Sequence, residues 1–220
     1  LPGQNGTEYC DLNRTEPGQT DFPVLNIRQG TPSVLDTQST PTLHDLPFRA
    51  ADFKTLSEAL DYAAQGETGA NFYTGRGQMY ATLPYSELRT RARALARKLL
   101  GMGLEKGDHV ALIAETNPEF LQFFFACQYA GLVPVALPAS IKLGGHTAYV
   151  QQLSGLLKSS QAVVAMAPEG YLSYLKEAGE GLGLRKIGTP ADFDSLPDAD
   201  VALPESGPED VAYIQYTSGS

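Results

Sequence analysis

Small hydroxyl and glycine residues follow directly after a β-rich segment at the end of the sequence. Residues 211–217 read VAYIQYT, and Thr217, Ser218, Gly219 and Ser220 come last. Phosphate oxygens are bound in proteins by hydroxyl donors and by backbone N–H groups that glycine leaves accessible. The four residues are therefore a candidate phosphate-binding turn. An ordinary exposed turn is the commoner origin of such a cluster, so the rest of the sequence must decide between the two.

Other residues that could carry chemistry have simpler interpretations. Gly101, Gly103 and Gly107 loosely resemble a dinucleotide-binding fingerprint. That fingerprint joins a strand to a helix, whereas these glycines follow a predicted helix, so a helix end and a turn explain them better. The three histidines show no metal-ligand spacing, and we expect no metal site. Three acidic residues near a predicted strand end are interpreted as turn and cap residues: Asp108, Glu115 and Glu119.

A phosphate-binding turn needs a sheet behind it, and the middle of the chain predicts one. Residues 109–114 (HVALIA) and 132–138 (LVPVALP) are apolar runs typical of strands that are covered on both faces. Between them, Asn117 and Pro118 begin a predicted helix that is apolar on nearly all sides and ends at Gly131. The strand–helix–strand order predicts parallel strands with a right-handed crossover.

Weaker versions of this pattern surround the central unit. Apolar spacing predicts helices over 52–64, from Pro84 to Leu99, around 149–157 and over 172–178. Short β-rich runs predict strands at 71–73, 78–83, 162–167, 184–187 and 211–217. Residues 188–209, rich in proline and aspartate, are predicted to be a connection. The expected fold class is α/β, with a doubly wound parallel sheet and helices on both faces.

Composition limits the classes of function. The 16 basic and 25 acidic residues give a net charge of −9, which argues against nucleic-acid binding because such proteins usually carry a basic stripe. The arginines of the helix from Pro84 to Leu99 are interpreted as a solvated face. No apolar run approaches the ~18 residues of a membrane helix. The separate cysteines, Cys10 and Cys127, favour reduced thiols in a cytoplasmic protein over a disulfide.

The chain divides into two regions by composition. Residues 1–44 are rich in proline, glycine, threonine, glutamine and asparagine without a sustained hydrophobic period, which predicts a flexible leader. Residues 45–220 carry the predicted helices and strands. The phenylalanines of the central helix (Phe120, Phe123, Phe124 and Phe125) are interpreted as core rather than as the wall of a lipid site.

The residues AYIQYTSGS resemble the start of the phosphate-binding signature of adenylate-forming enzymes, which reads roughly YTSGSTGxPKG. Further stretches resemble one branch of that superfamily, the fatty acyl-AMP ligases. They are LPFRAADFKTLSEALDYAA (46–64), NFY (71–73), GDHVALIAETNPEFLQFFFACQYAGLVPVALP (107–138) and DVAYIQYTSGS (210–220). Together they cover most of residues 45–220 in the order of the family, which favours the phosphate-binding interpretation of the last residues.

The resemblance implies a two-step reaction. A fatty-acid carboxylate attacks the α-phosphate of ATP, pyrophosphate leaves, and the acyl group passes from acyl-AMP to a phosphopantetheine thiol. The implied cofactors are ATP and Mg²⁺, and the implied partners are a fatty acid and an acyl carrier protein or a polyketide or peptide synthase. Within this scheme, Thr217, Ser218, Gly219 and Ser220 match the loop that holds the β- and γ-phosphates.

The sequence also departs from the family pattern. It lacks the second half of the phosphate loop, the adenine- and ribose-binding motifs, the Mg²⁺-binding Glu, and the C-terminal domain with its catalytic Lys. We therefore expect the N-terminal portion of an adenylation domain, divided within the phosphate loop and inactive alone, with no catalytic residue of its own. An acyl-CoA synthetase, a peptide-synthetase adenylation domain and, from another class, a non-catalytic α/β interaction module remain alternatives.

Overall fold

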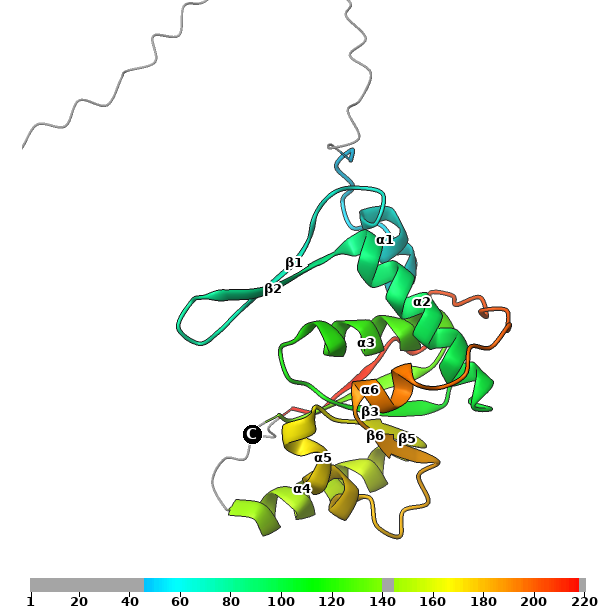
Figure 1. The fold of residues 1–220 in the computed structure, drawn as a ribbon. Coiled ribbons are helices and arrows are strands. Elements are labelled where there is room, and N and C mark those ends of the chain that lie inside the picture. Colours follow the sequence, from blue (N-terminus) through cyan, green and yellow to red (C-terminus); the bar gives the residue numbers. More distant parts are fainter. Residues whose placement is uncertain (1–45, 140–144, 218–220) are drawn as a thin grey trace, which may run out of the picture. The chain divides into compact units, whose positions relative to one another are not determined.

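The computed structural model describes residues 46–139 and 145–217, and Figure 1 shows their elements. The predicted leader, residues 1–44, lies outside the described residues. The helices are α1 (Leu56–Ala63), α2 (Tyr85–Gly101), α3 (Pro118–Ala130), α4 (Gly145–Ser160), α5 (Glu169–Ala178) and α6 (Pro190–Asp194). The strands are β1 (Gly69–Tyr73), β2 (Met79–Pro84), β3 (His109–Ile113), β4 (Val133–Leu137), β5 (Val164–Met166), β6 (Lys186–Gly188) and β7 (Ile214–Gln215).

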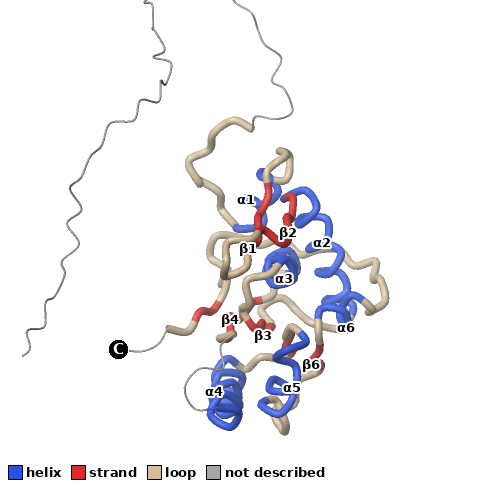
Figure 2. Tube along the Cα trace, turned by 60° about the vertical axis from the view of Figure 1, so that its left-hand side comes forward, coloured by secondary structure: helices blue, strands red, loops and turns tan. Residues whose placement is uncertain are grey.

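The central sheet has five parallel strands in the order β6-β5-β3-β4-β7. The chain passes from β3 to β4, crosses back to β5 and β6 on the other side of β3, and returns to place β7 beside β4. Helices α2, α3 and α6 cover one face of the sheet, and α4 and α5 cover the other (Figures 1 and 2). The predicted doubly wound parallel sheet with helices on both faces is therefore confirmed.

Alternating side chains of β3 separate the two layers of the core. Val110 and Leu112 pack with the apolar faces of α2 and α3, whereas Ala111 and Ile113 pack with those of α4 and α5. This alternation follows from the two-residue period of a strand. Because both faces are covered, all four side chains are fully buried, as the continuous apolar run over residues 109–114 predicts.

The helix between the two central strands confirms the predicted boundaries. The Asn117 side chain accepts a hydrogen bond from the Phe120 N–H at 2.8 Å, and Pro118 occupies the first turn. Gly131 ends the helix with φ of +65°, a left-handed conformation that favours glycine. These local signals fix where α3 begins and ends, and so fix the lengths of the connections to β3 and β4.

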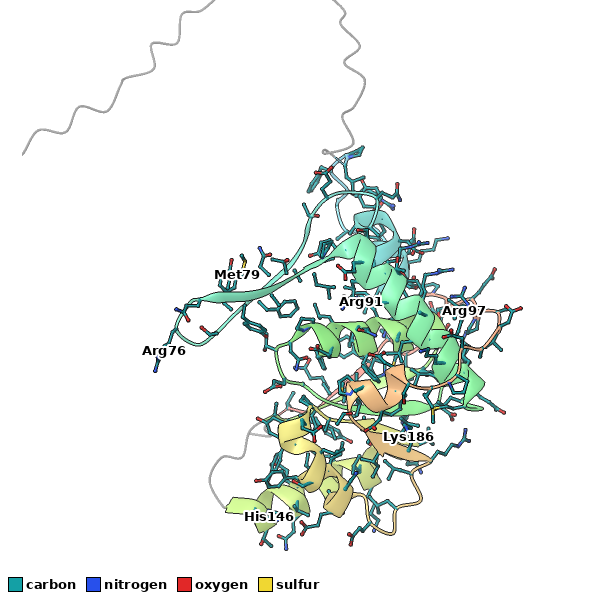
Figure 3. All side chains as sticks on the ribbon, in the orientation of Figure 1. Arg76, Met79, Arg91, Arg97, His146 and Lys186 are labelled. Carbon is teal, nitrogen blue, oxygen red and sulfur yellow. The ribbon has the colours of Figure 1, made fainter. Side chains whose placement is uncertain are left out.

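Strands β1 and β2 form a separate antiparallel hairpin. Phe72 and Leu83 are buried against the layer of α2 and α3. Arg76 and Met79 lie toward the outer end of the hairpin, away from the helices (Figure 3). Tyr80 connects the hairpin to the turn after β3, because its hydroxyl donates to the Thr116 carbonyl at 2.8 Å.

Residues 188–209 are not the plain connection predicted from composition, because they contain α6. The Thr189 side chain accepts from the Asp192 N–H, and the Asp192 carboxylate accepts from the Thr189 N–H at 2.8 Å, which forms a capping box. Pro190 occupies the first turn, and Phe193 is fully buried against Phe123 of α3. The capping residues and one buried aromatic side chain stabilise a helix of five residues.

Two predicted boundaries are also wrong. The helix predicted over 52–64 begins only at Leu56, because the Thr55 side chain caps it by accepting from the Glu58 N–H at 3.1 Å. The strand predicted over 211–217 pairs with β4 only at Ile214 and Gln215. None of the helices in the described ranges is both long and apolar enough to cross a membrane.

Candidate functional site

The carboxyl ends of the parallel strands meet at one edge of the sheet. The Ala114 N–H donates to the Leu137 carbonyl at 2.9 Å, which ties the end of β3 to the end of β4. On the far side of β4, strand β7 ends at Gln215, and Tyr216 and Thr217 follow. Open α/β sheets bind ligands at this edge, where connections leave for opposite sides of the sheet. The fold therefore places Thr217, the first residue of the predicted turn, where such sheets usually bind small molecules.

Side chains on both faces of the sheet hold β7. On the face of α3, the Tyr213 ring lies 5.7 Å from the ring of Phe124, measured between centroids. On the opposite face, Ile214 and Tyr216 pack into the cluster that α4 supplies. The Gln128 side chain of α3 donates to the Ala212 carbonyl at 2.5 Å, although Gln128 is almost completely buried. A strand of two residues is thus fixed mainly by its flanking side chains.

An ion pair fixes the segment before β7 at the opposite edge of the sheet. The Lys106 ammonium lies 2.8 Å from the Asp210 carboxylate, which also accepts from the Gly207 N–H at 2.8 Å. The hydrogen bond from Lys106 and then the one from Gly207 lower the pKa of Asp210. The segment that delivers β7 to the sheet is therefore fastened before the strand begins.

A cavity of about 390 Å³ lies beside the ends of β4 and β7. Its lining residues combine apolar side chains with two that carry carboxamides and two that carry hydroxyls. They are formed by Ala114, Ala136, Leu137, Pro138, Gln152, Leu156, Gln215, Tyr216 and Thr217. The volume is in the lower part of the range of small-molecule sites, and the few polar groups could orient a ligand. The exposed Thr217 hydroxyl can donate to an anionic oxygen.

Of the four predicted site residues, the structure describes Thr217 and places it at this cavity. Ser218, Gly219 and Ser220 lie outside the described residues, and their role stays a prediction. The sequence analysis missed Gln152 and Gln215, which line the same cavity from α4 and β7. No local signal identifies Gln152, since it comes from a helix more than sixty residues earlier in the chain.

Tyr149 supports the wall of this cavity from within the core. Its hydroxyl donates to the Pro138 carbonyl at 2.6 Å, directly after β4. Burial, helped by the neighbouring Tyr171 and Tyr174, raises the pKa of Tyr149 to about 12. The phenol therefore stays protonated near neutral pH and acts as a fixed hydrogen-bond donor rather than as a base.

The acidic residues considered in the sequence take structural positions. The Asp108 carboxylate accepts from the Glu105 N–H at 3.0 Å and closes the turn before β3. The Glu115 carboxylate accepts from the Asn117 side chain at 3.0 Å, and Glu119 lies in the first turn of α3. The described residues contain no group of three histidine, cysteine or acidic side chains that could hold a metal ion.

The phenylalanines of α3 divide into two groups. Phe123 is fully buried and packs edge-on against Phe193 with a centroid distance of 5.3 Å, as expected of a core residue. Phe120, Phe124 and Phe125 are only partly buried. Phe120 also lines a second hollow of about 220 Å³ near the end of β3. The interpretation as core is therefore confirmed fully for Phe123 and in part for the other three.

The chain belongs to the AMP-binding enzyme family, because residues 60–220 match the sequence profile of that family. A Caulobacter vibrioides protein named "Putative acyl-CoA synthetase" is 48% identical over 181 residues, which cover 82% of this chain. A medium-chain-fatty-acid acyl-carrier-protein ligase, JamA from Moorena producens, is 29% identical over 180 residues, 77% of this chain and 29% of its own length. Family membership is thus established.

The fold is also found in a solved structure of this family. A chain from a structural and functional study of fatty acyl-adenylate ligases from E. coli and L. pneumophila superposes with a TM-score of 0.75 and 46% identity. The match covers 79% of the present chain and 31% of that chain. The present chain likewise spans 31% of the length of the Caulobacter protein. The chain thus spans less than a third of the length of either relative.

Proposed function

We propose that the chain is the N-terminal portion of a ligase that activates a fatty acid with ATP to acyl-AMP and passes the acyl group to an acyl carrier protein. Residues 45–220 would belong to the adenylation domain of that ligase, and residues 1–44 would form a leader. The position of Thr217 carries the proposal. This residue follows the last strand of the parallel sheet and borders a 390 Å³ cavity at its carboxyl edge.

The chemistry of the site fits an anionic ligand. The Thr217 hydroxyl would donate to a phosphate oxygen, and the backbone N–H groups of the following serines and glycine would add further donors. In the activation step a carboxylate oxygen forms a bond to the α-phosphorus, and the bond from that phosphorus to the bridging oxygen breaks as pyrophosphate leaves. The protein contributes mainly by positioning ATP and by stabilising negative charge.

Mg²⁺ would reach the site as part of the ATP complex. Mg²⁺ bound to ATP neutralises charge on the polyphosphate. The described residues offer no cluster of ligands for a divalent ion, so none of them is proposed to hold it. The residues of this chain would bind phosphate oxygens.

The relatives support two acceptors for the acyl group. JamA is a ligase for an acyl carrier protein, and the solved chain comes from a study of fatty acyl-adenylate ligases. The Caulobacter protein, which is more similar in sequence than JamA, is named for acyl-CoA synthesis. We favour the carrier protein and keep coenzyme A as the second candidate.

The test uses the full-length protein with ATP, Mg²⁺ and a long-chain fatty acid. Fatty-acid-dependent release of pyrophosphate is expected. If the protein is folded but releases no pyrophosphate, the proposal is contradicted. Coenzyme A and phosphopantetheinylated carrier protein are then supplied in separate reactions, with transfer followed by mass spectrometry. Acylation of the carrier protein alone supports the favoured acceptor, and acyl-CoA alone supports the second. A further reaction with amino acids in place of the fatty acid tests the peptide-synthetase alternative.

A further inference from the structure

Tyr216, the residue before Thr217, is joined to helix α4 by its side chain. Its ring packs in the apolar cluster on that face of the sheet, beside Leu156. Its hydroxyl oxygen lies 2.6 Å from Oγ of Ser159 and 3.3 Å from the Leu156 carbonyl oxygen. A helix that ends at residue 160 is thereby connected to the start of the candidate phosphate-binding turn.

Two arrangements of these hydrogen bonds use one proton from each hydroxyl. In one, the Ser159 hydroxyl donates to the Leu156 carbonyl at 3.2 Å and accepts from Tyr216. In the other, Ser159 donates to the Tyr216 hydroxyl, which donates to the Leu156 carbonyl at 3.3 Å. Both hydroxyls are satisfied, so the side-chain position of Tyr216 is well defined.

The β-ladder does not provide this restraint. Strand β7 pairs with β4 through Val135 with Ile214 and Ala136 with Gln215, and the register stops there. Tyr216 and Thr217 come after the last rung. The hydroxyl pair of Ser159 with Tyr216, which we name the α4 anchor, therefore acts where the strand pairing ends.

We propose that the α4 anchor positions Thr217 for ATP, so that Ser159 and Tyr216 are positioning residues for Thr217. This inference rests on the proposed function, since it assigns Thr217 to ATP. Neither hydroxyl needs to touch the nucleotide. The anchor instead raises the fraction of molecules in which the Thr217 hydroxyl is placed to bind, and the apparent affinity for ATP falls in proportion when that fraction falls.

A residue on the other side of β7 offers a matched control. Tyr213 lies three residues earlier, and its ring packs on Phe124. Its hydroxyl has no hydrogen-bond partner within the described part of the chain. Tyr213→Phe therefore removes the same atom as Tyr216→Phe without breaking the anchor, and comparing the two variants separates the anchor from any general effect of losing a phenol.

The experiment measures steady-state kinetics of pyrophosphate release by the full-length protein. For Tyr216→Phe we expect the KM for ATP to rise about three- to tenfold, the effect of losing one hydrogen bond of ordinary strength. The KM for the fatty acid and the kcat should change less than about twofold. Ser159→Ala should raise the KM for ATP less, because the Leu156 carbonyl can still accept from Tyr216, and Ser159→Thr should restore the wild-type value.

Two results would overturn the inference. One is a KM for ATP in Tyr216→Phe that matches the wild type, and the other is an equal rise in Tyr213→Phe. A second measurement does not depend on activity: amide hydrogen exchange of the full-length protein should accelerate at residues 214–217 in Tyr216→Phe alone, with β3 unchanged. Unchanged exchange contradicts the anchor, whereas a wild type that releases no pyrophosphate contradicts the proposed function, so the two failures are distinguishable.

Discussion

The substitution Phe123→Ala tests whether the aromatic face of α3 is a structural core. Phe123 is fully buried, and its ring meets that of Phe193 edge-on with planes inclined by 83°. Truncating a buried phenylalanine costs about 3–5 kcal/mol. An edge-to-face aromatic pair adds about 0.5–1.5 kcal/mol beyond burial, which places the expected loss in the upper half of that range.

The assay is urea denaturation of the 220-residue chain, which gives the free energy of unfolding and its dependence on denaturant. Phe120→Ala is the control, because Phe120 is only partly buried at the rim of the hollow after β3, and a loss of about 1–2 kcal/mol is expected. Phe123→Leu serves if the alanine variant does not fold, with a smaller loss of about 1–2 kcal/mol. A cost for Phe123→Ala no greater than that of Phe120→Ala would refute the assignment of Phe123 to the core.

Two further predictions concern a buried phenol and a left-handed glycine. Between pH 10 and about 12 the unfolded chain loses the Tyr149 proton while the folded chain keeps it, so the wild type should lose stability as pH rises. Denaturation at several pH values gives the change of unfolding free energy per pH unit, which Tyr149→Phe should reduce by up to about 1.4 kcal/mol. An unchanged pH dependence would contradict the raised pKa of Tyr149. Gly131→Ala should cost about 1–2 kcal/mol, because φ is +65° and the new Cβ would lie 2.9 Å from Cγ of Lys106. Gly155 lies in α4 with open space around it, so Gly155→Ala should be neutral or stabilising by up to about 1 kcal/mol. Thermal denaturation measures both variants. A Gly155→Ala variant less stable than Gly131→Ala would contradict the role given to the left-handed conformation of Gly131.

The central unit was predictable because its local signals agree. Asn117 and Pro118 mark the start of α3, Gly131 marks its end, and continuous apolar runs flank it on both sides. Each signal acts within a few residues, and none conflicts with another. The α/β class and the parallel pairing of β3 with β4 therefore follow from the sequence.

The errors in the predicted elements occur where tertiary contacts decide. Helix α6 has only five residues, too few for a hydrophobic period, and its one large apolar anchor is Phe193. The β-rich run over residues 211–217 pairs at only two positions, because the ladder with β4 is short. The capping signal at Thr189 was present in the sequence but lay within a stretch whose composition favours a loop.

The candidate site was predictable only in part. The residue types at the end of the sequence identify Thr217 as a phosphate-binding candidate, and the fold places it at the carboxyl edge of the sheet. Strand order has no local signal, so the position of β7 beside β4 could not be derived. The same holds for contacts across long separations, such as that of Ser159 with Tyr216 and the cavity wall formed by Gln152.

Fatty-acid-dependent exchange of pyrophosphate into ATP tests the central claim most directly. The full-length protein should catalyse this exchange, and Thr217→Val should raise the KM for ATP about tenfold or more, because a hydrogen bond to a charged group contributes about 1.5–3 kcal/mol. The valine variant should keep its stability, since Thr217 is exposed. Exchange that does not depend on fatty acid would contradict the proposed activation of a fatty acid, and an unchanged KM for ATP in the variant would contradict the proposed role of Thr217.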